Sequence, residues 1–100
     1  MFARVSRYEA PKDEVDEALA AFEASTEAVR QMPGIERAYL LVDRQGGRVL
    51  TITVWESEES MAASAEAAKA LRSQAMGAAG GSVVAVETYE VASMEDFTGR

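Results

Sequence analysis

The chain opens on an alternating pattern of apolar and polar residues, Phe-Ala-Arg-Val-Ser-Arg-Tyr-Glu, over residues 2–9. A period of two is typical of a β-strand whose two faces meet different surroundings. The alternation places Phe2, Arg4, Ser6 and Tyr8 together on one face of this predicted strand. The opposite face carries alanine, valine and arginine.

A helical period follows this strand. Pro11 suits the first turn of a helix, and the acidic residues at positions 13, 14, 16 and 17 complement the positive end of the helix dipole. Mostly apolar residues then recur at spacings of three and four, which predicts a long helix with one buried face. This stripe consists of Val15, Ala18, Leu19, Phe22, Thr26, Val29 and Met32. Pro33 and Gly34 are expected to end the helix.

Two extended runs, residues 35–43 and 48–55, come next and are separated by a short turn with two adjacent glycines. This spacing predicts a β-hairpin. Both faces of its second strand are largely apolar. One face has Leu50, Ile52 and Val54, and the other has Val49, Thr51, Thr53 and Trp55.

A second helix is predicted after the hairpin. Ser57 suits its N-cap, and two glutamates follow in the first turn. The helix is expected to run towards Met76 and to end at Gly77 and the Gly80–Gly81 pair. Residues 82–91, rich in valine, threonine and tyrosine, form the last predicted strand.

The predicted order of elements is βαββαβ, which is typical of a ferredoxin-like α+β domain. Such a domain has a four-stranded antiparallel sheet with two helices on one face. We expect residues 1–91 to form this single domain and residues 92–100 to form a C-terminal tail. Because both faces of the hairpin strands are apolar, the face away from the helices needs a cover, and a second copy of the chain is the simplest one.

Composition narrows the chemistry. The chain has no cysteine and no histidine, which excludes disulfides, thiolate nucleophiles, a histidine base and histidine-bound zinc or haem. The net charge of −7 argues against a nucleic-acid surface, and no apolar run is long enough for a membrane span. We therefore predict a cytoplasmic protein without a metal or cofactor, and with neither nucleic acid nor membrane as a partner.

Three short motifs carry a family resemblance. They are Pro33-Gly34-Ile35, Tyr39-Leu40-Leu41 and the run Thr-Val-Trp-Glu-Ser-Glu-Glu at residues 53–59. Over roughly residues 2–91 the chain resembles the antibiotic-biosynthesis-monooxygenase family of the dimeric α/β-barrel superfamily. The resemblance implies a homodimer whose two sheets form a barrel, with a ligand cleft between sheet and helices in each subunit. It also implies activities such as cofactor-independent oxygenation of quinols and polyketide-like aromatics, or haem degradation.

The chain departs from this family pattern in two ways. The family often has a histidine nine or ten residues after the tryptophan, and here Ser64 and Ala65 occupy those places. The haem-degrading branch also uses an asparagine on the first strand, and this chain has no asparagine. These departures argue against haem degradation.

Four side chains are candidates for binding a substrate. Trp55 would form a pocket wall, Tyr39 a hydrogen-bond donor, Arg37 an anion clamp and Tyr8 a proton relay. Each also has a structural interpretation, because Trp55 can pack the end of the core and the tyrosines can point into water. For Arg4 and Arg37 that interpretation is an ion pair with a glutamate of the last strand, at position 87 or 90.

Two functions remain open from the sequence. In the first, the protein is a cofactor-independent monooxygenase that acts on a small aromatic quinol or phenol. In the second, it is a non-catalytic homodimer of the same fold that binds a small ligand or a protein partner. The missing histidine favours the second, and the extent of the family pattern favours the first.

Overall fold

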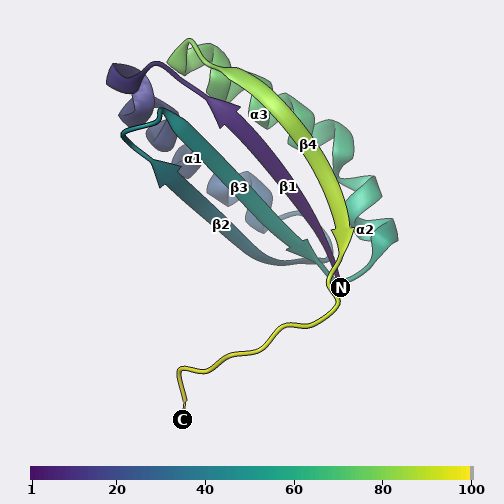
Figure 1. Cartoon of the computed structure of the whole chain (residues 1–100). Coiled ribbons are helices and arrows are strands. Elements are labelled where there is room, and N and C mark those ends of the chain that lie inside the picture. The colour runs from purple at the N-terminus through teal and green to yellow at the C-terminus, as the bar shows by residue number, and fades with distance from the viewer. Residues whose placement is uncertain (100) are drawn as a thin grey trace.

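The computed structural model of the chain describes residues 1–99. Its elements follow the predicted order, and Figure 1 shows the sheet in front of the helices. They are β1 (Phe2–Glu9), a 3-10 turn (Lys12–Glu14), α1 (Val15–Arg30), β2 (Ile35–Asp43), β3 (Arg48–Trp55), α2 (Glu58–Ala63), α3 (Ala65–Ala79) and β4 (Ser82–Glu90). The ferredoxin-like βαββαβ prediction is confirmed.

The four strands form one antiparallel sheet in the order β2-β3-β1-β4. In β1, Arg4 lies opposite Thr53 of β3, and Ser6 lies opposite Thr51. Because successive side chains alternate between faces, these four polar residues share one face of the sheet. It is the face that the helices cover, since Arg4 and Ser6 are both buried.

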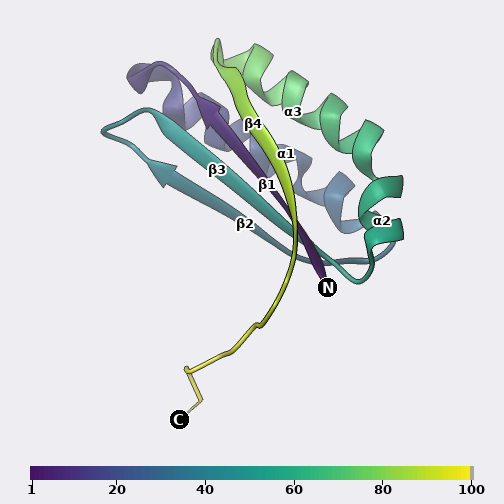
Figure 2. The same ribbon diagram turned by 45° about the vertical axis from the view of Figure 1, so that its right-hand side comes forward.

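The helices pack on this face and on each other, as the turned view in Figure 2 shows. Tyr8 from β1 and Phe22 from α1 meet in the core with ring centroids 4.8 Å apart. Around them lie small or flexible side chains, among them Ala18, Ala75 and Met76. Small alanine side chains let α3 approach α1 closely. The buried residues of α3, Ala75, Met76 and Ala79, all lie near its C-terminal end.

The opposite face of the sheet, here called the outer face, has no helix of residues 1–99 over it (Figure 2). It carries exposed large apolar side chains, among which Tyr39, Leu41 and Tyr89 are 43%, 47% and 50% exposed. In the described part of the chain, no helix is long and apolar enough to cross a membrane. After β4, residues 91–97 have no regular structure and lead away from the sheet (Figure 1).

The second predicted helix differs from the expectation in two ways. It is divided at Ser64 into α2 and α3, and it continues through Gly77 to Ala79. Ser57 caps α2 as predicted, with its side chain accepting from the backbone N–H of Ser60. Gly77 does not end the helix, because a glycine inside a helix weakens it without breaking it. The helix ends instead at Gly80, which takes the left-handed conformation of a helix C-cap.

The turn between α1 and β2 depends on Gly34. Its φ of +83° lies in the left-handed region, and a Cβ at this position would lie 2.4 Å from the Cβ of Ser60. The carbonyl of Gly34 also accepts a hydrogen bond from the N–H of Glu56, at 2.8 Å. Gly34 therefore brings the end of α1 against the start of α2.

We predict opposite effects for two glycine-to-alanine substitutions. Gly34→Ala should lower the free energy of unfolding by at least about 2 kcal/mol, because it combines a left-handed φ with a steric clash. Gly77→Ala should raise it by about 0.5–1 kcal/mol, since the position is helical and a Cβ there meets no described atom within 4 Å. Urea unfolding of both variants measures the two changes, and a Gly34→Ala variant as stable as the parent would contradict the first.

Candidate functional site

A cavity of about 170 Å³ lies between the sheet and the helices. Its floor comes from three strands, and its other walls come from α1, α3 and Met32, which lies just after α1. The lining residues are Arg4, Ser6, Tyr8, Phe22, Ser25, Thr26, Val29, Met32, Ala38, Tyr39, Leu40, Thr51, Thr53, Trp55, Ala68, Leu71 and Arg72. A mostly apolar cavity with a few convergent polar groups is the usual form of a small-molecule site.

Trp55 lines the cavity and is 1% exposed. Its indole N–H donates to the hydroxyl of Thr53, at 2.9 Å, so the buried polar atom of the ring has its partner. The guanidinium carbon of Arg4 lies 5.6 Å from the ring centroid, a distance at which a cation is attracted to the face of an indole. Trp55 thus presents an apolar wall next to a positive charge.

Tyr8 is the second aromatic group of the floor and is equally buried. Its hydroxyl lies 3.0 Å from the hydroxyl of Thr51. Thr51 lies on β3, directly opposite Ser6 of β1. Burial raises the pKa of Tyr8, and the nearby hydroxyls of Thr51 and Ser6 offset only part of that rise. Tyr8 is therefore a neutral phenol at neutral pH, able to donate or accept a hydrogen bond.

Arg4 is the buried cation of the cavity, with 6% of its surface exposed. Its guanidinium donates to the carbonyl of Met61 at 2.7 Å and to the hydroxyl of Ser64 at 3.2 Å. These two partners lie at the junction of α2 and α3, so Arg4 joins β1 to both helices. Burial lowers the pKa of Arg4, and the positive charge of Arg72 lowers it further.

Arg72 is a lining residue that sequence analysis missed. It lies on α3 one residue after the apolar Leu71, and both residues line the cavity. Helical spacing from Ala68 predicts that positions 71 and 72 share a face with it, so this signal was present in the sequence. From sequence alone, an arginine beside an alanine-rich stripe is interpreted as a solvent-exposed charge. Only the packing of α3 against the sheet shows that Arg72 lines the cavity.

Two of the four candidate residues, Tyr8 and Trp55, lie inside the cavity. Tyr39 borders it between Ala38 and Leu40, but its phenol is 43% exposed and lies 3.4 Å from the guanidinium of Arg37. The structure does not bring Arg37 into the cavity, because it is exposed and is not among the lining residues.

The outward position of Arg37 follows from the way β2 pairs with β3. The pairing of β2 with β3 shifts between Ile35 and Arg37, so Arg37 lies opposite Val54 and the next residue, Ala38, lies opposite Thr53. Ala38 lines the cavity, and alternation therefore directs Arg37 to the outer face. Sequence alternation alone could not place it, since it gave no sign of this irregularity.

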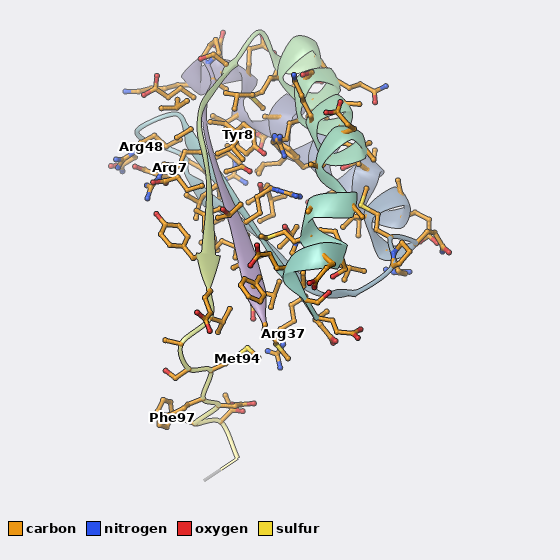
Figure 3. All side chains as sticks on the ribbon, turned by 90° about the vertical axis from the view of Figure 1, so that its right-hand side faces the viewer. Arg7, Tyr8, Arg37, Arg48, Met94 and Phe97 are labelled. Atoms are coloured by element: carbon orange, nitrogen blue, oxygen red, sulfur yellow. The ribbon has the colours of Figure 1, made fainter. Side chains whose placement is uncertain are left out.

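The predicted ion pair of Arg4 or Arg37 with a glutamate of the last strand is not the pair that forms. Glu87 pairs with Arg7, at 3.2 Å, on the outer face. Figure 3 shows Tyr8 between sheet and helices, whereas Arg7 and Arg48 lie on the other side of the sheet. Hydrogen bonds from Tyr89 and Arg7 lower the pKa of Glu87. In the described part of the chain, Arg4 has no carboxylate partner.

The chain belongs to the antibiotic biosynthesis monooxygenase family, whose model matches residues 1–76. The matched region contains the whole floor of the cavity that β1, β2 and β3 form, together with Arg72. The family resemblance seen in the sequence is thereby confirmed.

Two curated relatives come from Mycobacterium tuberculosis. They are the uncharacterised proteins MT2634, of strain CDC 1551 / Oshkosh, and Rv2557, of strain ATCC 25618 / H37Rv, and each is 34% identical to this chain over 95 residues. The match covers 94% of this chain but 42% of each relative, so the chain spans less than half the length of these proteins.

Solved structures share the fold at lower identity. A candidate antibiotic biosynthesis monooxygenase from Deinococcus radiodurans superposes with a TM-score of 0.77 at 17% identity, over 99% of this chain and 100% of that one. A variant of SnoaB, a cofactor-independent oxygenase from Streptomyces nogalater, superposes with a TM-score of 0.69 at 13% identity, over 93% of this chain and 94% of SnoaB. At these identities the likeness establishes the fold.

We predict that Tyr8→Phe changes both the stability and its dependence on pH. The ring keeps its packing against Phe22, and the loss of the bond to Thr51 should lower the free energy of unfolding by about 1 kcal/mol near pH 7. Since burial raises the pKa of Tyr8 above its ordinary value of 10.0, the unfolded chain releases this proton at a lower pH than the native protein does. The resulting stabilisation is complete below that ordinary value and is lost as pH rises through the native pKa.

Urea unfolding at several pH values up to about 11 tests this prediction. The parent protein should lose stability more steeply at alkaline pH than Tyr8→Phe. Parallel pH profiles for the two proteins would contradict it.

Proposed function

We propose that this protein is a cofactor-independent monooxygenase whose substrate is a small electron-rich aromatic, a quinol or a phenol, bound in the cavity next to Trp55. The observation that carries the proposal is the cavity itself, in which an aromatic wall, a neutral phenol and a buried cation converge. The size is suitable, because an engineered protein cavity of about 150 Å³ holds one benzene ring.

The reaction needs no cofactor if the substrate supplies the electrons. For a quinol, one molecule of O₂ converts a ring C–H and the two hydroxyls into a hydroxyquinone, and the second oxygen atom leaves as water. The quinol supplies four electrons in this step, so atoms and electrons balance without a flavin or a metal. The protein would exclude water, hold the ring and favour the ionised substrate.

Deprotonation is where the buried cation would act. A phenolate reduces oxygen more readily than a phenol, and a positive charge close to a bound phenol lowers its pKa. Arg4 and Arg72 would supply that charge, and Tyr8, a neutral phenol, would donate a hydrogen bond to the phenolate oxygen. A histidine base is then unnecessary if the proton of the bound phenol passes to a water molecule, while Arg4 and Arg72 stabilise the phenolate that remains.

We also propose that the protein acts as a homodimer that pairs through the outer faces of two sheets. The apolar side chains exposed there form a continuous strand surface that no segment of the described chain covers. Pairing by a two-fold axis would bury the same residues from both copies.

Oxygen consumption tests the proposed activity. With hydroquinone as substrate, the parent protein should consume one O₂ per quinol and form the hydroxyquinone. Ala68→Phe places a ring in the cavity and should abolish this turnover, whereas Ala67→Phe, at an exposed position on the same helix, should leave it unchanged. Absence of turnover above the autoxidation rate, or equal turnover in Ala68→Phe, would overturn the proposal.

Light scattering at micromolar concentration tests the dimer. We expect a mass of about twice the 10.7 kDa of one chain. Leu41→Glu places a charge on the outer face and should reduce the mass to that of one chain. Val86→Glu is the matched control, because Val86 is similarly exposed but lies opposite Ser6, on the helix-covered face. A single-chain mass for the parent protein would contradict the proposal.

A further inference from the structure

Among residues 1–99, the cavity is lined by two arginines and by no acidic side chain. Arg4 and Arg72 both line it, and the charge of Arg72 is close enough to lower the pKa of Arg4. None of the cavity's lining residues in the described part of the chain is an aspartate or a glutamate. This is unusual for a chain with a net charge of −7, because acidic partners are abundant elsewhere on it.

The structural role of Arg4 accounts for only part of this arrangement. Among the described residues, Arg4 uses two of its five N–H groups, one toward Met61 and one toward Ser64. The other groups stay available beside the face of Trp55. Arg72 is partly buried and makes no hydrogen bond or ion pair to the described part of the chain. No contact within the described chain therefore accounts for a positive charge at this position.

Elsewhere in the molecule, arginines form ion pairs with acidic side chains. Arg7 pairs with Glu87, Arg44 with Asp16 and Arg48 with Asp43, all of them exposed. Arg4 and Arg72, by contrast, have no acidic partner among the described residues. Two like charges beside a mostly apolar cavity repel each other, and a bound anion would stabilise both of them. A carboxylate fits this need best, since a guanidinium binds both of its oxygens through parallel N–H groups.

We infer that the natural ligand of the cavity is an aromatic carboxylate, with its carboxylate held between Arg4 and Arg72 and its ring against Trp55. This inference rests on the proposed function insofar as an aromatic ring occupies the cavity. It adds that the ring bears an acid group, so a carboxylate ligand binds more tightly than a neutral phenol of the same size, which still enters the cavity. The hydroxyl of such a ligand would face Tyr8 and Thr51.

Calorimetric titration under anaerobic conditions tests the inference with three compounds that differ at one substituent. They are 2,5-dihydroxybenzoate, 2,5-dihydroxybenzamide and hydroquinone. The carboxylate should bind at least about tenfold more tightly than the amide, which has the same shape without the charge. Arg72→Gln should weaken binding of the carboxylate by about 10- to 100-fold and leave the amide nearly unaffected.

Lys69→Gln is the matched control, since Lys69 is an exposed cation on the same helix outside the cavity. It should bind the carboxylate as the parent protein does. Arg4→Lys keeps the charge and tests the geometry of the fork, and it should weaken the carboxylate more than the amide. Circular dichroism verifies that each variant is folded.

The outcomes separate this inference from the proposed function. Equal affinity for carboxylate and amide, or an equal loss of both in Arg72→Gln, would overturn the anion site while leaving an aromatic cavity. Binding of none of the three compounds would overturn both. Binding of the carboxylate that survives Ala68→Phe would place the anion elsewhere and would also overturn the inference.

Discussion

The buried guanidinium of Arg4 is the interaction on which the rest of the site depends. It reaches from β1 to the carbonyl of Met61 and the hydroxyl of Ser64, where α2 gives way to α3. A buried charge is costly unless it is hydrogen bonded, so these contacts and the face of Trp55 make its position tolerable. By fixing the junction of the helices against the sheet, Arg4 also fixes how far α3 stands from the floor of the cavity.

The cavity brings a neutral phenol and two positive charges close together, and this combination suits an anionic ligand. Tyr8 is a neutral phenol, because burial disfavours its ionised form. Arg4 and Arg72 bring positive charge to the same half-open, mostly apolar space, where Coulomb interactions are stronger than in water. Such a site can stabilise an anion without a residue that accepts a proton. The absence of histidine from the chain therefore removes one mechanism and leaves an electrostatic one.

The two faces of the sheet have different roles because strand side chains alternate. Arg4, Ser6 and Tyr8 face the helices, and Arg7 belongs to the outer face, where it pairs with Glu87. Two irregularities in strand pairing modify this simple rule, one between Arg7 and Tyr8 against β4 and one between Ile35 and Arg37 against β3. The second one directs Arg37 away from the cavity.

The order of elements, their approximate bounds and the polar stripe of β1 follow from the sequence, because hydrophobic period and turn residues act locally. The period-two pattern already groups Arg4, Ser6 and Tyr8 on one face, and Trp55 is recognisable as a large aromatic at the end of a strand. Three features depended on tertiary structure. The break at Ser64 arises where α2 and α3 meet the Arg4 side chain, the outward position of Arg37 arises from pairing with β3, and the entry of Arg72 into the cavity arises from the packing of α3. Each of these is decided by contacts between segments far apart in the chain, which a local sequence pattern does not determine.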